Sequence, residues 1–246
     1  MKRLAVALAL VAGLAIVWLL RAERPGFRTF EGEAMATRWQ LTLPDRPEAE
    51  AAARASFEML VRLDAELSEW QEGSPLTAVN RAAGAAPVEV PDDLYELLER
   101  SVELGRATDG AFDVTWAALW GIWDFRAPVP RLPDPAEIAA RVARVDYRRL
   151  VLDPAARTAF LPEAGMVAGL GAIGKGYALD RVAQELARRG FGDFLLVGGG
   201  QVLARGRRGD WPWRVGLRDP RGGPEELFAR VELGDGSLST SADNES

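Results

Sequence analysis

The sequence predicts an α+β domain in which mixed, mostly antiparallel sheets pack against helices. Apolar and polar residues alternate over 35–43, as in a half-buried strand. Apolar residues recur at helical spacing over 57–67 and again over 94–102. In the second half, a strand, a Gly-rich turn and a helix lead into several further strands, which completes a mixed pattern of helices and strands.

Each element of the first half has a local signal. Asp45 and Pro47 open the first helix, whose apolar face is expected to include Val61. A polar loop is expected over 68–80. A second helix starts near Asp92 and stops before Thr108. The remaining elements expected here are a short helix capped by Asp134-Pro135 and two strands around 150–152 and 159–161.

The second half is read in the same way. A strand at 166–168 precedes a Gly-rich turn at 169–176, a helix at 177–189 and a strand at 193–197. Gly190 follows the helix where a C-terminal cap favours a residue free to take positive φ. The last expected strands lie near 214–217, 227–231 and 237–241.

The N-terminus carries an uncharged apolar run over 4–20 between basic residues. The run is long for a signal-peptide core and short for a spanning helix. No small-x-small site follows it at 22–24, so we expect 1–24 to be an uncleaved signal anchor, with a cleaved signal peptide as the alternative. The basic residues before the run favour a domain at 25–246 on the periplasmic, extracytoplasmic side of the inner membrane.

The composition excludes several chemistries. The 246 residues are 48% hydrophobic, which is typical of a globular protein with a core. A net charge of −6 argues against a nucleic-acid partner. The chain has no Cys and no His, so disulfides, thiol nucleophiles, Cys/His zinc sites and a histidine base are excluded. Carboxylates, hydroxyls, backbone amides and hard cations such as Mg²⁺ remain, and these suit phosphate esters.

The Gly-rich turn at 169–176 matches G-x-G-x-x-G and falls one residue short of a P-loop. A P-loop needs Ser or Thr after Lys175, where Gly176 stands, and a dinucleotide fold needs an acidic residue after the next strand, where Gly198 stands. The features that both patterns share are still present. Backbone amides left free by Gly, a helix N-terminus and a nearby lysine all suit the binding of a diphosphate. Alternatively, the glycines only permit close packing.

Six short blocks follow one another along the chain after residue 25. The most distinctive, Thr-Asp-Gly-Ala-Phe-Asp-Val-Thr at 108–115, precedes a helix expected to end at 119–123. Together the blocks resemble the FAD:protein FMN transferase family, the ApbE-like flavin transferases, and imply an ApbE-like (T-fold-like) domain. The other blocks are 35–37, 67–80, 170–181, 199–200 together with 213–220, and 240–243.

The resemblance implies a set of site residues. Those at positions that contact FAD are Met35, Trp70, Ala111, Phe112, Asp113 and Lys175, and the backbone carbonyl of Ala172 stands at a metal-ligand position for Mg²⁺. Trp70 offers a π-face to a flavin, and Lys175 offers a charge to a diphosphate. Taken singly, Met35, Ala111 and Phe112 suit a core, and Asp113 a helix cap. We expect three further tryptophans to be core residues: Trp116, Trp120 and Trp123.

The activity implied by the resemblance is Mg²⁺-dependent transfer of the FMN moiety of FAD to a threonine of an acceptor protein, with release of AMP. Two alternatives stay open. In the first, water replaces the threonine hydroxyl and the protein is an FAD pyrophosphatase. In the second, the protein is a non-catalytic extracytoplasmic flavin-binding protein.

The sequence departs from the family pattern at four places. Ala36 replaces a Gly of the opening strand, Gly169 replaces an Asp that helps hold the flavin nucleotide, and Gln201 replaces an acidic residue or Asn. The chain also stops at Ser246, before the C-terminal segment that carries the family's remaining metal ligands. We therefore expect a domain truncated at its C-terminus, with little Mg²⁺-dependent release of AMP from FAD.

Overall fold

The structure is a computed structural model that describes residues 26–124, 129, 132–223 and 226–241. The chain forms two compact units. The first unit comprises the described residues of Met1–Gly32, Arg38–Ala55 and Glu185–Ser246, and the second comprises those of Glu33–Thr37 and Ser56–Gln184. The residues of the expected signal anchor lie outside the described part of the chain. Among the helices that are described, none is long and apolar enough to cross a membrane.

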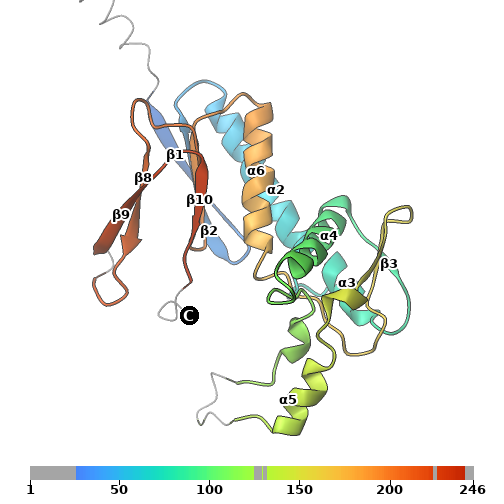
Figure 1. Cartoon of the computed structure of the whole chain (residues 1–246). Coiled ribbons are helices and arrows are strands. Elements are labelled where there is room, and N and C mark those ends of the chain that lie inside the picture. Colours follow the sequence, from blue (N-terminus) through green and yellow to red (C-terminus); the bar gives the residue numbers. More distant parts are fainter. Residues whose placement is uncertain (1–25, 125–128, 130–131, 224–225, 242–246) are drawn as a thin grey trace, which may run out of the picture. The chain divides into compact units, whose positions relative to one another are not determined.

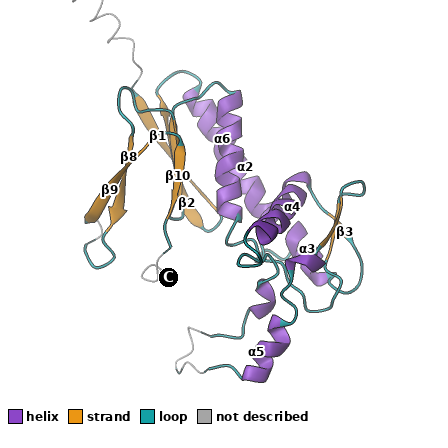
Figure 2. Ribbon diagram, viewed as in Figure 1, coloured by secondary structure: helices purple, strands orange, loops and turns teal. Residues whose placement is uncertain are grey.

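The first unit contains a five-stranded sheet in the order β1-β2-β6-β7-β10 (Figures 1 and 2). From β2 onwards, each strand pairs antiparallel with the next in this order. A separate antiparallel pair, β8 (Trp213–Arg218) with β9 (Leu227–Leu233), also belongs to this unit. The five strands of the larger sheet are β1 (Phe27–Ala34), β2 (Thr37–Pro44), β6 (Phe194–Gly198), β7 (Gln201–Arg205) and β10 (Gly236–Ser239).

The core of this sheet follows from the alternation in β2. Trp39, Leu41 and Leu43 are fully buried, while their polar neighbours face outward. Gly198, the register partner of Trp39 on β6, makes room for the indole, because a Cβ there would lie 2.4 Å from the ring. A side chain at 198 would therefore displace the largest buried residue of the sheet.

The second unit is mostly helical. Its helices are α3 (Pro75–Arg81), α4 (Asp92–Ala107), α5 (Pro135–Val142), the later part of α2 (Ala49–Leu67) and the first part of α6 (Gly174–Arg188), with short 3₁₀ helices at Ala117–Leu119 and Tyr147–Arg149. A small antiparallel sheet has the order β3 (Val88–Glu89), β5 (Thr158–Phe160), β4 (Val151–Asp153). Ser74 and Asp134 cap the helices that follow them, each with a Pro at the first helical position.

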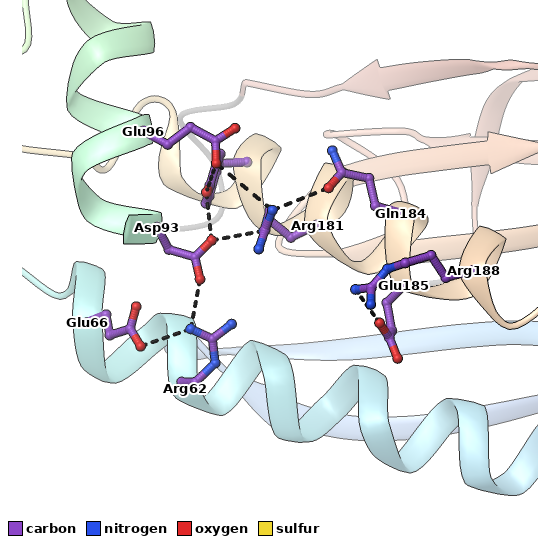
Figure 3. Close-up of polar contacts among 9 residues, drawn as sticks. Arg62, Glu66, Asp93, Glu96, Arg181, Gln184, Glu185 and Arg188 are labelled. Atoms are coloured by element: carbon purple, nitrogen blue, oxygen red, sulfur yellow. Dashed lines mark hydrogen bonds and ion pairs between the residues drawn. The ribbon is translucent and has the colours of Figure 1, made fainter. Parts of the chain in front are cut away.

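A polar network joins three helices of the second unit (Figure 3). Asp93 on α4 is buried and accepts hydrogen bonds from Arg62 on α2 and from the Tyr177 hydroxyl on α6, both at 2.7 Å. Arg181, also on α6, lies 2.9 Å from the same carboxylate. Burial alone would raise the pKa of Asp93, but these hydrogen bonds and the charge of Arg181 outweigh it and lower the pKa. The network thus fixes the N-terminal part of α6.

Most of the predicted elements are confirmed. Helices begin at Asp92 and after Asp134, Gly190 has positive φ, and the strands expected near 150–152, 159–161, 193–197, 214–217, 227–231 and 237–241 are present within a residue or two. The mixed α+β class with antiparallel sheets is confirmed as well. The division into an anchor at 1–24 and one domain at 25–246 stays a prediction.

Several local predictions are wrong. The loop expected at 68–80 contains α3, and Val61 is 56% exposed. The segment 166–168 forms only an isolated parallel bridge, between Val167 and Trp116, and the side chain of Asn80 bonds both the amide and the carbonyl of Ala168. Two further errors concern helix limits: α6 starts at Gly174 instead of 177, and the helix expected before 123 is one 3₁₀ turn at Ala117–Leu119.

Candidate functional site

Met35 lies in the two-residue turn between β1 and β2. Met35 and Ala36 have φ values of 52° and 55°, which are the positive values that a tight type I′ hairpin requires of both turn residues. Ala36 therefore adopts a conformation that glycine takes without strain, and Met35 is held half-buried at the tip of the hairpin.

Several amides of the Gly-rich turn already donate hydrogen bonds to backbone carbonyls. The amide of Gly169 donates to the Val114 carbonyl at 2.8 Å, and the amides of Ile173 and Gly174 donate to the Leu170 carbonyl at 3.0 and 2.7 Å. The expectation that glycine frees these amides for a diphosphate is therefore wrong for these positions. What remains for an anion is the N-terminal turn of α6 with half-buried Lys175.

Lys175 stands out in a chain that relies on arginine. Of the 30 Lys and Arg residues, only Lys2 and Lys175 are lysines. An ammonium is a compact point charge with three donors, whereas a guanidinium is a planar fork. Lys175 is thus the one lysine among the residues that the structure describes.

Glu69 connects the loop after α2 to the Gly-rich turn. Its Oε2 atom accepts a 2.7 Å hydrogen bond from the amide of Leu170. Partial burial raises the pKa of Glu69, while the amides of Leu170 and Gly171 oppose the shift. The sequence reasoning missed this residue, although it lies within the block at 67–80.

Three tryptophans form an aromatic series beside this turn. Trp70 is 76% exposed and stacks on Trp120, with ring centroids 4.7 Å apart and planes 21° apart. Trp120 in turn meets the edge of Trp116 at 5.7 Å, and the indole nitrogen of Trp116 donates to the Gly169 carbonyl at 3.2 Å. One face of Trp70 is therefore supported by protein, and the exposed remainder can take a planar ligand.

This arrangement corrects the expectation that Trp116, Trp120 and Trp123 are core residues. Trp116 and Trp120 are only half-buried, and Trp123 is 38% exposed. The i,i+4 spacing of Trp116 and Trp120 gives no signal for this arrangement, because the segment is a single 3₁₀ turn at Ala117–Leu119 and Trp120 has a non-helical ψ of 142°.

The 108–115 block is a loop that is held by hydrogen bonds to the Asp113 side chain. Asp109 and Gly110 both have positive φ, and Ala111 is exposed while Phe112 is half-buried. Asp113 accepts hydrogen bonds from the Thr115 amide at 2.8 Å, the Thr115 hydroxyl at 2.6 Å and the Tyr147 amide at 2.9 Å. Both oxygens of the carboxylate thus hold the loop together.

Described contacts join three segments of the site. Trp70 and Glu69 meet the 116–120 and 169–171 segments, and Asp113 lies in the segment that leads to Trp116. Met35 lies on its separate hairpin and is not joined to the others by any of these contacts. Ala172 is exposed on the turn. Within the described ranges, no three or more acidic side chains gather where they could hold a metal ion.

Comparisons with known proteins agree with one another. The model of the ApbE family matches residues 35–246. A FAD:protein FMN transferase of Treponema pallidum is 34% identical over 212 residues, which cover 80% of this chain and 59% of that protein. A FAD:protein FMN transferase of Klebsiella pneumoniae is 31% identical, with 86% of this chain and 62% of that protein covered. The chain thus spans about three fifths of these relatives.

Solved structures show the same likeness. The crystal structure of the ApbE protein from Thermotoga maritima has a TM-score of 0.76 at 27% identity and covers 89% of this chain and 71% of its own. The flavin transferase ApbE from Vibrio cholerae has a TM-score of 0.77 at 23% identity, covers 89% and 72%, and supports the fold alone.

Proposed function

Because the chain belongs to the ApbE family, we propose that it binds FAD and transfers the FMN half to an acceptor protein. The relatives that it matches carry the name FAD:protein FMN transferase. The structural observation that carries the proposal is the exposed ring of Trp70, supported from behind by Trp120 and adjacent in sequence to the residue that bonds the Gly-rich turn. A flavin would stack on this ring.

The proposed reaction is attack by a threonine hydroxyl of the acceptor on the FMN-side phosphorus of FAD. The threonine oxygen forms a bond to that phosphorus, the bond from the phosphorus to the bridging oxygen breaks, and AMP leaves with the electron pair of that bond. The threonine proton passes to solvent. Lys175 in the first turn of α6 would balance the negative charge of the diphosphate.

Mg²⁺ belongs to the proposal through the family resemblance. The ion would neutralise charge on the leaving phosphate oxygens. It requires about six oxygen ligands in near-octahedral arrangement, and the exposed Ala172 carbonyl supplies one. The described residues, which lack a cluster of three acidic side chains, do not fit a complete magnesium site.

The two alternative activities share this binding site. A pyrophosphatase would use water in place of the threonine hydroxyl. A flavin-binding protein without catalysis would need only the aromatic surface at Trp70 and Trp120.

Incubation with FAD separates the three. Transferase activity gives AMP together with acceptor protein that retains flavin fluorescence after denaturation, and it needs the acceptor. Pyrophosphatase activity gives AMP and free FMN without an acceptor. Binding without either product supports the flavin-binding alternative and contradicts the transferase.

The proposed location is the extracytoplasmic side of the inner membrane. The uncharged run at 4–20 supports it. Fusion of a periplasm-dependent reporter after residue 246 tests the proposal, because an inactive reporter would place the domain in the cytoplasm.

A further inference from the structure

Glu69 occupies a space that exists because residue 169 has no side chain. A Cβ built on Gly169 would lie 3.1 Å from the Oε2 atom of Glu69 and 2.8 Å from the Cβ of Ala117. Gly169 is buried, and Glu69 is half-buried. The carboxylate thus reaches the turn from a loop 101 positions away in sequence.

A carboxylate is the natural partner for the amides of this turn. An aspartate at position 169 would bond an amide two residues ahead within its own turn, as Asp side chains commonly do. Gly169 cannot do this, and the carboxylate of Glu69 bonds the amide of Leu170 instead. Hydrogen bonds from amides to an ionised acceptor are stronger than those to a neutral one.

We propose that Glu69 is the positioning residue of the Gly-rich turn: it replaces a local acidic side chain at 169 and fixes the backbone that leads into Lys175. The same loop continues into Trp70, so one short segment, Glu69-Trp70, sets both the turn and the aromatic surface. The effect of Glu69 on ligand binding rests on the proposed function, whereas its hold on the turn does not.

Hydrogen exchange tests the hold on the turn without any ligand. In the full chain, E69A should increase the exchange rate of the Leu170 amide about tenfold or more, because its charge-assisted hydrogen bond to Glu69 is lost. E69Q keeps an accepting oxygen at the same reach and should retain part of the protection. E72A is the matched control, since Glu72 lies in the same loop with a side chain that is 92% exposed. Unchanged exchange in E69A, or equal acceleration in E72A, would overturn the proposal.

Flavin binding then tests the positioning role. E69A should lower the affinity for FAD about tenfold and that for riboflavin by less than about threefold, since the turn leads to the charge that meets phosphate. E69Q should recover FAD affinity in step with amide protection, and it carries the test if E69A does not fold.

Equal losses for FAD and riboflavin would overturn the positioning role. An E69Q protein with restored protection but no recovery of FAD binding would also overturn it. If the unaltered chain binds neither flavin, the proposed function fails, and the exchange experiment alone decides whether Glu69 holds the turn.

Discussion

Replacement of Asp93 by asparagine probes the network that anchors the start of α6. D93N preserves the side-chain volume and one acceptor oxygen but removes the charge that Arg62 and Arg181 share. Breaking a fully buried ion pair costs about 3–5 kcal/mol of unfolding free energy. Here the side chains of Arg62 and Arg181 are 46% and 28% exposed, so water can solvate them after the substitution. The Tyr177 hydroxyl also retains its hydrogen bond to Glu96 at 3.0 Å. We therefore expect a loss of about 2–3 kcal/mol.

The same network predicts a pH dependence of stability. The pKa of Asp93 is lowered in the folded protein from an ordinary value of 3.8, so the unfolded chain binds its proton more readily. The stabilisation is then fully present above about pH 4 to 5 and is lost as the pH falls through the lower folded value. D93N removes this contribution, so its loss of stability relative to the unaltered chain should shrink in acid.

Urea denaturation at pH 7 and pH 3 measures both effects. D92N is the matched control, because Asp92 lies in the same first turn of α4. Its side chain pairs with Arg157 but is itself 84% exposed. It should cost less than about 1 kcal/mol, most of it from the helix dipole. The reasoning is refuted if D93N costs no more than D92N at pH 7, or if its cost is undiminished at pH 3.

Three further outcomes are expected. W70A should weaken FAD binding by about 1–3 kcal/mol, measured by flavin fluorescence, while removal of the exposed Trp211 by W211A should not. K175A should weaken FAD more than riboflavin and flatten the salt dependence of FAD binding, and equal losses would make Lys175 structural. A36G should raise the unfolding free energy by about 1 kcal/mol, because glycine takes φ near 55° without strain, and no gain in urea denaturation would count against strain in this turn.

The elements that the sequence predicts well are those whose own apolar side chains follow the spacing of a strand or a helix. Trp39, Leu41 and Leu43 alternate within β2, and the buried leucines of α4 repeat at helical spacing. The strand β1 was missed because its burial alternates only weakly. The helix α3 was missed because its start signal, Ser74-Pro75, is polar and resembles a turn.

The candidate site shows the same difference between local and distant information. Trp70 and Lys175 are predicted through the family resemblance, and their surroundings in the sequence, a polar loop and a Gly-rich turn, agree with that prediction. The partner of the turn was not predictable, because the fold brings Glu69 to Leu170 over 101 positions. The spacing of Gly169 and Gly171 suggested free amides, and only the structure shows that several of them are already bonded.

Asp113 shows that a residue in a distinctive sequence block can fix the backbone conformation of a site as well as supply its chemistry. Its carboxylate binds the amide of Tyr147, and the ring of Tyr147 packs where a Cβ at Gly105 would lie 2.7 Å from it. Gly105 on α4 therefore admits the tyrosine, and Asp113 holds the same tyrosine's backbone. The loop that presents Ala111 and Phe112 lies between these two fixed points in sequence, and its conformation depends on both. An Asp113 variant that lost flavin binding would consequently reveal a contact with the ligand only if Gly105→Ala, which disturbs the same tyrosine from the other side, left binding intact.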